Sequence, residues 1–170
     1  ALVNNNTSED NAKEVADALI SAEFDGQAGH GLSRIPSYVE QLTAGKVKGT
    51  EAPSIISSKG SVIRVDAKNG FAYPAISLAL KEITTACKKF GIAAASITRS
   101  HHFGQAGRHV EILADNGLIG LMFGNTPKAI PPWGGTKALF GTNPIAFSAP
   151  RENDAPMVID MSLSKVARGK

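Results

Sequence analysis

The feature that most constrains the fold of this chain is a repeated switch between strand-like and helix-like spacing of its apolar residues. The alternating segments predict, in order, strand, helix, strand, helix and strand at 61–67, 72–90, 92–98, 104–116 and 118–123. We expect the strand IAAASIT at 92–98 to be buried, because it is almost wholly apolar. A β-α-β-α-β order of this kind is typical of a mixed α/β domain.

The residues before this series predict two helices. Thr7 or Ser8 caps a first helix that ends before Gly26. Pro36 suits the first turn of a second helix, which Gly45 stops. We expect residues 46–60, which contain glycines, a proline and several serines, to be mostly connection.

The residues after the series combine a long loop with further strands. NTPKAIPPWGGTKALFGTNP at 125–144 is rich in glycine and proline, and loops of this length are usually functional or disordered. IAFSAP at 145–150 and MVIDMS at 157–162 predict two strands, and SKVARGK at 164–170 predicts the start of a helix.

Composition excludes several classes of protein. A chain of 170 residues with 42% hydrophobic and 19% charged residues suits one globular domain. The net charge of +3 comes from scattered residues, which argues against a nucleic-acid partner. No apolar run approaches the roughly 20 residues of a membrane span, and the N-terminus lacks a signal-peptide pattern. The single cysteine, Cys87, fits a reducing compartment, so we expect a cytoplasmic protein.

Two common kinds of ligand site are missing from the sequence. GHGLSR places Arg34 where the dinucleotide fingerprint of a Rossmann domain requires its third glycine, and no predicted strand precedes it. Any dinucleotide must therefore bind in another way. The four histidines and Cys87 also lack the close spacing of zinc ligands, so we expect no metal.

His30, Arg34 and Tyr38 follow one another at intervals of four residues. On an early-starting helix they would share one face, although Pro36 opposes regular helix before it. An arginine fork, a phenol hydroxyl and an imidazole together suit a small carboxylic acid. The alternative is that Arg34 and Tyr38 are surface residues beside a capping loop.

The segment TRSHHFGQAG at 98–107 places two histidines at a predicted strand-to-helix junction. Imidazole titrates close to neutral pH, so at most one of His101 and His102 is expected to be an acid or base, and the alternative is a helix cap followed by a polar loop. Ser100 is either part of such a site or simply a helix N-cap.

Several motifs in fixed order give the chain a resemblance to a known family. HGLSRIPSYVEQLTAG, VDAKNGFAYPA, SHHFGQAG, PPWGGTK, FGTNPIAFSAP and VIDMSLSKVARGK resemble the N-terminal half of the type-2 malate/L-lactate dehydrogenases. That family includes ureidoglycolate dehydrogenase, L-sulfolactate dehydrogenase and diketogulonate reductase. The resemblance implies an enzyme that uses NAD or NADP to interconvert a small 2-hydroxy acid and a 2-oxo acid. It also implies a non-Rossmann α/β fold with a mixed, largely antiparallel sheet and flanking helices, usually in a homodimer.

The resemblance assigns roles to individual residues. His102, in the S-x-H-x-G motif, exchanges a proton with the substrate oxygen, and His30 assists it. Arg34, Tyr38 and Ser100 bind the substrate. The residues expected to contact the dinucleotide are Thr126, Asn143, Pro144, Asp160, Met161 and Ser162. One departure is Gly29, which stands where many members have serine.

The resemblance also predicts how the chain is organised. Residues 1–60 form a helical segment that carries substrate-binding residues, and residues 61–170 form an α/β cofactor-binding portion that is incomplete at its C-terminus. Because members of the family are about twice this length, we expect the chain to be truncated. The alternative function is therefore a non-catalytic truncated paralogue that acts as a binding or assembly module.

Overall fold

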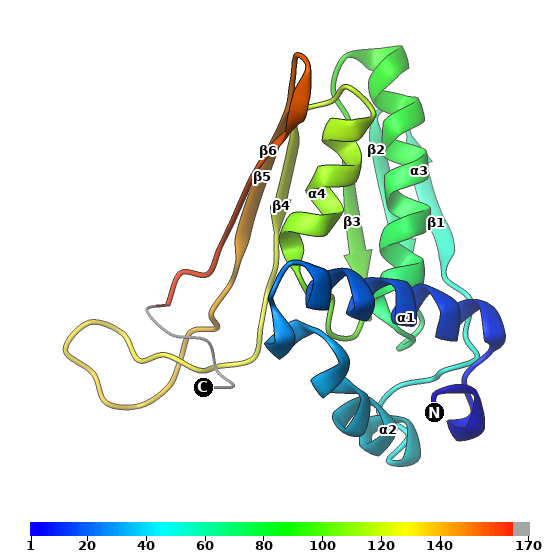
Figure 1. The fold of residues 1–170 in the computed structure, drawn as a ribbon, viewed down its shortest axis with the longest axis vertical. Helices are drawn as coiled ribbons and strands as arrows, with labels where there is room; N and C mark the ends of the chain where they lie inside the picture. Colours follow the sequence, from blue (N-terminus) through cyan, green and yellow to red (C-terminus); the bar gives the residue numbers. More distant parts are fainter. Residues whose placement is uncertain (165–170) are drawn as a thin grey trace. The chain divides into compact units, whose positions relative to one another are not determined.

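The computed structural model describes residues 1–164, which form helices and two small sheets (Figure 1). The chain divides into two compact units, Ala1–Gln105 and Ala106–Lys170. The predicted α/β class is confirmed, with the strands divided between two three-stranded sheets. No helix among residues 1–164 is both long enough and apolar enough to cross a membrane. The helix predicted to start within 164–170 falls on residues 165–170, outside the described part of the chain.

The helices of the first unit begin where their capping residues predict. A short 3-10 turn, Val3–Asn5, precedes α1, Glu9–Phe24, and the backbone N–H of Asn11 donates to the Ser8 hydroxyl, so Ser8 is the cap. Two more 3-10 turns, Ala28–His30 and Leu32–Arg34, lead into α2, Ile35–Thr43, which has Pro36 in its first turn. These turns take the place of the early helix start that would align His30, Arg34 and Tyr38.

The first unit also contains a mixed sheet in the order β1-β2-β3, and α3 packs against it (Figure 1). β1, Ser54–Lys59, runs antiparallel to β2, Val62–Asp66, and β2 runs parallel to β3, Ala94–Thr98. The helix α3, Ala72–Phe90, connects β2 to β3 and ends at Gly91 in the left-handed conformation.

The predictions for this sheet hold only in part. Residues 46–53 are connection, as expected, but the prediction missed β1 at Ser54–Lys59, which forms a hairpin with β2 through Gly60, whose φ is +59°. The expected functional division at residue 60 falls within that hairpin. β3 is not buried as predicted: Ala94, Ser96 and Thr98 are exposed, while Ala95 and Ile97 pack against the cluster beneath α3. Side chains of a strand point alternately to its two faces, and this strand is covered on one face only.

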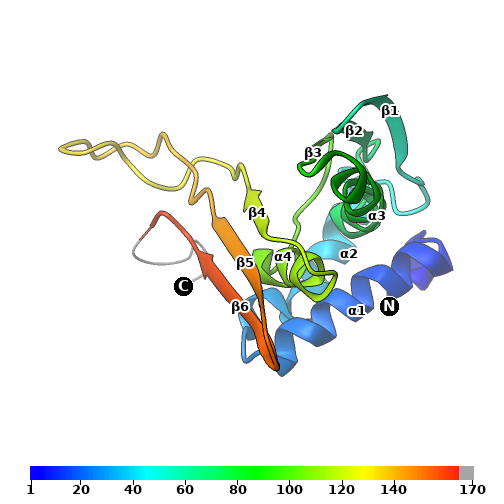
Figure 2. The ribbon, with the colours of Figure 1, turned by 90° about the horizontal axis from the view of Figure 1, so that it is seen from above.

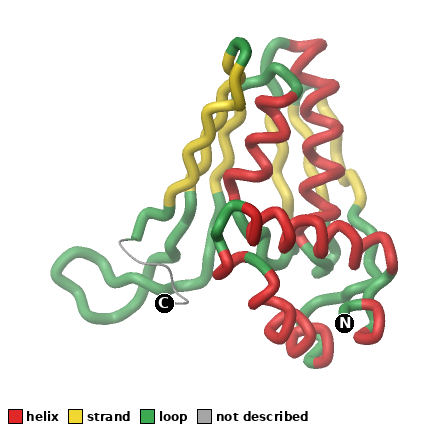
Figure 3. Tube along the Cα trace, viewed as in Figure 1, coloured by secondary structure: helices red, strands yellow, loops and turns green. Residues whose placement is uncertain are grey.

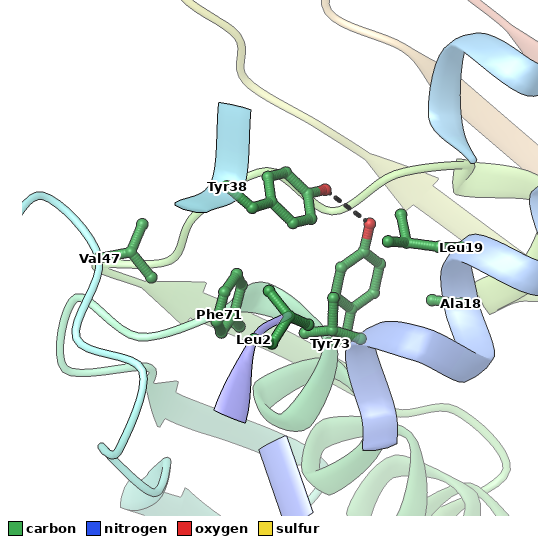
Figure 4. Close-up of a cluster of buried hydrophobic side chains, with 8 residues drawn as sticks. Leu2, Ala18, Leu19, Tyr38, Val47, Phe71 and Tyr73 are labelled. Atoms are coloured by element: carbon green, nitrogen blue, oxygen red, sulfur yellow. Dashed lines mark hydrogen bonds between the residues drawn. The ribbon is translucent and has the colours of Figure 1, made fainter. Parts of the chain in front are cut away.

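Two apolar clusters hold the first unit together. One lies between the sheet and α3 and is centred on Ile63, Val65 and Ala75. The other joins α1, α2 and the start of α3 (Figure 4), and it contains Leu2, Val15, Ala18, Leu19, Tyr38, Val47, Phe71 and Tyr73. This second cluster fixes the tyrosine rings that are relevant to the functional site.

The second unit is a helix packed on an antiparallel sheet in the order β4-β5-β6 (Figure 2). Its elements are α4, Ala106–Asp115, β4, Gly120–Phe123, β5, Ile145–Arg151, and β6, Asp154–Met161. The Ser148 hydroxyl on β5 donates to the carbonyl oxygen of Val110 on α4. A Cβ on Gly120 would lie 2.7 Å from the Ser148 hydroxyl oxygen, so a glycine at this position lets helix and sheet approach closely.

The sheet face opposite α4 is apolar and open. In the strand register, Leu121 pairs with Phe147 and Phe147 with Ile159, while Phe123 pairs with Ile145 and Ile145 with Met161. Leu121, Phe123, Ile159 and Met161 are all exposed. The predicted long loop at 125–144 is confirmed between β4 and β5 (Figure 3), with one bridge between Ile130 and Phe140. Trp133 on this loop is fully exposed.

Candidate functional site

The first unit brings His102 next to two buried tyrosines. Tyr38 comes from α2, Tyr73 from the first turn of α3, and His102 from the loop after β3. The Tyr38 hydroxyl lies 2.7 Å from Nδ1 of His102 and 3.0 Å from the Tyr73 hydroxyl, a contact drawn in Figure 4. Tyr38 is 1% exposed and Tyr73 is 2% exposed. Because Nδ1 is occupied by Tyr38, Nε2 is the nitrogen of His102 that remains for a substrate oxygen.

His30 and Arg34 complete this part of the site. The His30 ring stacks on that of His102, with centroids 5.6 Å apart and an interplanar angle of 9°. Arg34 is half-buried, and its Nε donates to the carbonyl oxygen of Gly29. The structure therefore places His30, Tyr38 and His102 together, with the charge of Arg34 close enough to act on His102.

The two adjacent histidines have different surroundings. Nε2 of His101 lies 2.9 Å from the side-chain oxygen of Gln41, and its ring makes edge contacts with Tyr38 and Phe71. These contacts fix His101 against α2 and the first cluster. The ring of His102, by contrast, stacks on the imidazole of His30, and its Nδ1 is hydrogen-bonded to the hydroxyl of Tyr38.

Burial controls the charge of these side chains. It lowers the pKa of His102 to about 3, and the positive charges of Arg34 and His30 act in the same direction. Burial alone lowers the pKa of His101 to about 4, and burial raises the pKa of Tyr38. At neutral pH, His102 is therefore an uncharged imidazole beside a protonated phenol.

The neutral state of His101 predicts a loss of stability in acid. Its folded-state pKa of about 4 lies below the ordinary 6.5, so unfolding takes up a proton between these values and stability falls as pH falls from 6.5 towards 4. At pH 5 this amounts to about 2 kcal/mol for one such group. In urea unfolding at pH 7.5 and pH 5, we expect His101→Gln to lose less stability than the original chain.

A matched variant tests whether this loss belongs to the buried ring. His102→Gln removes the second neutral imidazole and reduces the acid loss in the same direction, because the pKa of His102 is also lowered. Equal losses in the original chain and in His101→Gln would show that His101 is not held neutral in the folded state.

An ion pair anchors the loop that carries both histidines. Arg99, whose φ is +53°, donates to the Asp66 carboxylate, and the Lys68 backbone N–H donates to the same carboxylate. The Arg99 hydrogen bonds lower the pKa of Asp66 to about 2, so this carboxylate stays charged. Ser100 follows on the exposed side of the loop, and α4 begins only at Ala106, so the interpretation of Ser100 as a helix N-cap is wrong.

The second unit gathers part of the predicted cofactor set at one end of its sheet. The Thr126 backbone N–H donates to the side-chain oxygen of Asn143, and the Asn143 backbone N–H donates to the Thr126 hydroxyl. Pro144 accepts from the backbone N–H of Gly124, which leads into the same turn. Leu163, next to Ser162, donates its backbone N–H to the carbonyl oxygen of Thr142. Thr126, Asn143 and Pro144 thus form one polar cluster, and Ser162, whose own hydroxyl contacts Ser164, precedes the residue that bonds to Thr142.

Asp160 and Met161 are the last two residues of β6. The Asp160 carboxylate accepts from the backbone N–H of Gly107 at 2.7 Å, in the first turn of α4. A Cβ on Gly107 would lie 3.2 Å from this carboxylate, so the two positions are sterically matched. Asp160 therefore stabilises the helix N-terminus, and Met161 lies on the open apolar face.

The sequence did not reveal two members of these clusters. Tyr73 and Thr142 are brought into place by packing, and neither stands at a spacing that marks it as functional. The only feature of the sequence that draws attention to Tyr73 is its place in the motif VDAKNGFAYPA. Within residues 1–164, no group of three or more His, Cys, Asp or Glu side chains is placed to hold a metal ion.

Comparison with known proteins relates this chain to one enzyme family. Residues 1–170 match the family described as malate/L-lactate dehydrogenase. The chain is 52% identical over 159 residues to (2R)-3-sulfolactate dehydrogenase (NADP(+)) of Chromohalobacter salexigens, covering 94% of this chain and 47% of that protein. It is 41% identical over 160 residues to a Delta(1)-pyrroline-2-carboxylate/Delta(1)-piperideine-2-carboxylate reductase of Pseudomonas syringae pv. tomato, with coverages of 92% and 47%.

Solved structures show the same relationship. The crystal structure of delta1-piperideine-2-carboxylate reductase from Pseudomonas syringae matches with a TM-score of 0.88 at 38% identity, covering 99% of this chain and 51% of that one. Malate dehydrogenase from Entamoeba histolytica matches with a TM-score of 0.92 at 30% identity, with coverages of 97% and 46%. The chain spans about half the length of the relatives it matches.

Proposed function

Since the chain belongs to the malate/L-lactate dehydrogenase family, we propose that it carries the proton-transfer and acid-binding groups of an NAD(P)-dependent oxidoreductase acting on a small 2-hydroxy or 2-oxo acid. The observation that carries this proposal is the position of His102, with Nδ1 held by Tyr38, one face stacked on His30 and the charge of Arg34 nearby. Two of the relatives named above, sulfolactate dehydrogenase and malate dehydrogenase, are dehydrogenases of hydroxy acids, and the third is a reductase of cyclic imino acids.

The chemistry of His102 follows from its charge state. Oxidation of a hydroxy acid needs a base for the hydroxyl proton, and a neutral imidazole with Nε2 available supplies one. In the reverse direction the same nitrogen returns the proton to the carbonyl oxygen. A substrate carboxylate beside Arg34 offsets a positive charge that lowers the pKa of His102, so binding raises that pKa and favours the proton donor.

The neighbours of His102 divide the remaining tasks. Arg34 offers its guanidinium to the substrate carboxylate, since a planar fork suits two carboxylate oxygens. His30 contacts the substrate beside His102, and exposed Ser100 contributes its hydroxyl at the edge of the loop. The hydroxyl of Tyr38 is taken up by His102 and Tyr73, which favours a role through His102 over direct contact with the acid.

We assign the dinucleotide to the polar cluster of the second unit. Hydroxyl and amide groups of Thr126, Asn143 and Ser162, with the backbone around Pro144, suit the ribose and carboxamide groups of NAD or NADP. Asp160 and Met161 contribute from the end of β6. When bound, the dinucleotide supplies the hydride chemistry, and the protein supplies position and proton transfer.

A spectrophotometric assay tests the proposal. NADH and NADPH oxidation is followed with 3-sulfopyruvate, oxaloacetate, pyruvate and cyclic imino acids, beside a titration of cofactor binding. The 52% identity to a sulfolactate dehydrogenase that uses NADP(+) places 3-sulfopyruvate with NADPH first in our expectation. Turnover of none of these acids by any form of the protein that binds the dinucleotide would rule the function out.

A second function, a binding or assembly module, is favoured by the open apolar face of β4, β5 and β6. Exposed apolar patches of this kind mark interaction surfaces. We expect the chain to self-associate through this face as a homodimer, and sedimentation velocity across a concentration series measures this. Ile159→Lys, on the face, should shift the chain towards monomer.

A lysine introduced outside the apolar face provides the control. Glu152→Lys alters the exposed turn between β5 and β6 and should leave the association unchanged. A monomer at all concentrations would contradict the assembly function and leave the enzyme proposal to be decided by the assay.

From the single cysteine, we place the protein in a reducing cytoplasm.

A further inference from the structure

We propose that Tyr73 is a positioning residue for the imidazole of His102 and acts on it through Tyr38. This inference rests on the proposed function of His102. The Tyr73 hydroxyl lies 3.0 Å from that of Tyr38, which in turn lies 2.7 Å from Nδ1 of His102. These two tyrosines are the only tyrosines of the chain, and both are almost completely buried.

The hydroxyl pair serves both charge states of His102. In the neutral tautomer that can accept a substrate proton, the ring proton is on Nδ1, Nδ1–H donates to the Tyr38 oxygen, and the Tyr38 hydroxyl donates to Tyr73. Nε2 then gains the substrate proton, and the charged ring keeps the same Nδ1–H bond to Tyr38. In the other neutral tautomer Tyr73 donates to Tyr38, Tyr38 donates to Nδ1, and Nε2 carries the ring proton, so this tautomer cannot act as the base.

Tyr73 is needed because Tyr38 is shielded from water. A Tyr38 hydroxyl that accepts from Nδ1–H must send its own proton to another acceptor, and at 1% exposure the Tyr73 oxygen provides it. A buried donor without an acceptor is unfavourable, whereas an unfilled acceptor position on an oxygen is better tolerated. Loss of the Tyr73 hydroxyl therefore disfavours the charged imidazole more than the neutral one.

Gly104 provides an independent observation for this arrangement. A Cβ at this position would lie 2.6 Å from the Tyr73 hydroxyl oxygen, and the φ of Gly104 is +68°. The glycine of the S-x-H-x-G segment thus leaves room for the Tyr73 hydroxyl against the loop that carries His102. A side chain at position 104 would displace one or the other.

Tyr73→Phe tests the proposal, because it removes the hydroxyl and keeps the ring in the core. The first measurement is the ¹⁵N NMR spectrum of the histidine rings of the chain itself, which has four histidines. We expect the Nδ1 resonance of His102 to move towards that of a nitrogen with a weaker hydrogen bond, because Tyr38 loses the donor that polarises it. The control is Ser77→Ala. It removes a hydroxyl of α3, the helix that carries Tyr73, that bonds to Glu14 on α1, and it should leave this resonance unchanged.

The second measurement is the pH profile of turnover in a catalytically competent form of the protein. We expect Tyr73→Phe to lower kcat about tenfold with KM unchanged and to shift the imidazole limb of the profile to lower pH. Gly104→Ala, which displaces the same hydroxyl, should move both measurements in the same direction and serves as the second variant if Tyr73→Phe does not fold.

The two measurements separate the possible failures. An unchanged Nδ1 resonance in Tyr73→Phe overturns the role of Tyr73, whether or not the protein turns over an acid. A shifted resonance in a protein that turns over none of the tested acids supports the hydroxyl pair and overturns the proposed function instead.

Discussion

Replacing His102 by alanine should reduce turnover by about 10²–10⁴-fold, the range over which a positioned acid or base contributes to rate. The physical reason is that alanine lacks both the Nε2 that exchanges the proton and the Nδ1 that Tyr38 holds at 2.7 Å. Steady-state kinetics in a competent form of the protein measure the change in kcat. A dinucleotide titration should give nearly the same Kd as before, since His102 belongs to the first unit and the predicted dinucleotide residues to the second.

Two further variants separate loss of the proton carrier from loss of structure. His102→Asn keeps an acceptor for the Tyr38 hydroxyl but carries no titrating nitrogen, so it should fold and still be inactive. His101→Gln keeps a partner for Gln41, and it should affect turnover far less than either substitution of His102. Full turnover in His102→Asn would remove the proton-transfer role.

Arg34→Lys should raise KM for the acid by one to two orders of magnitude, while KM for the dinucleotide stays within about twofold. Lysine keeps the positive charge and loses the planar fork that binds two carboxylate oxygens together. It also loses the Nε donor that bonds the carbonyl oxygen of Gly29. Initial-rate kinetics with each substrate varied in turn measure the two constants.

The charge of Arg34 makes a second variant informative. Arg34→Gln removes a positive charge that lowers the pKa of His102, so the imidazole limb of the pH profile should move to higher pH. Arg34→Lys should leave that limb nearly in place. If KM rose equally for acid and dinucleotide in Arg34→Lys, the residue would be a structural element of the loop and not the carboxylate ligand.

The site shows which of its parts could be predicted from the sequence. His30, Arg34 and Tyr38 stand at regular spacing and were singled out together, although 3-10 turns and not one early helix arrange them. His102 was distinguished from His101 only by resemblance to the family motif. The structure adds a physical distinction, since His101 is fixed by Gln41 and Phe71 while His102 is bonded to Tyr38.

Asp160 has a contact that the sequence did not reveal. Its carboxylate accepts from the backbone N–H of Gly107, 53 residues away, while its assignment to the dinucleotide stays a prediction. No local sequence pattern predicts this contact, because the contact depends on where α4 packs on the sheet. Tyr73 likewise carries no local signal of its contact, since its partner Tyr38 is 35 residues away.

By itself the sequence determined what depends on neighbouring residues: the α/β class, the Ser8 and Gly91 ends of helices, and the ordered motifs that indicate the family. Tertiary structure alone decided the β1 hairpin, the division of strands between two sheets and the bonding of Tyr73, Tyr38 and His102. The reason is physical: caps and periodicity act within a few residues, whereas hydrogen bonds between side chains 35 and 64 residues apart exist only once the cores have packed.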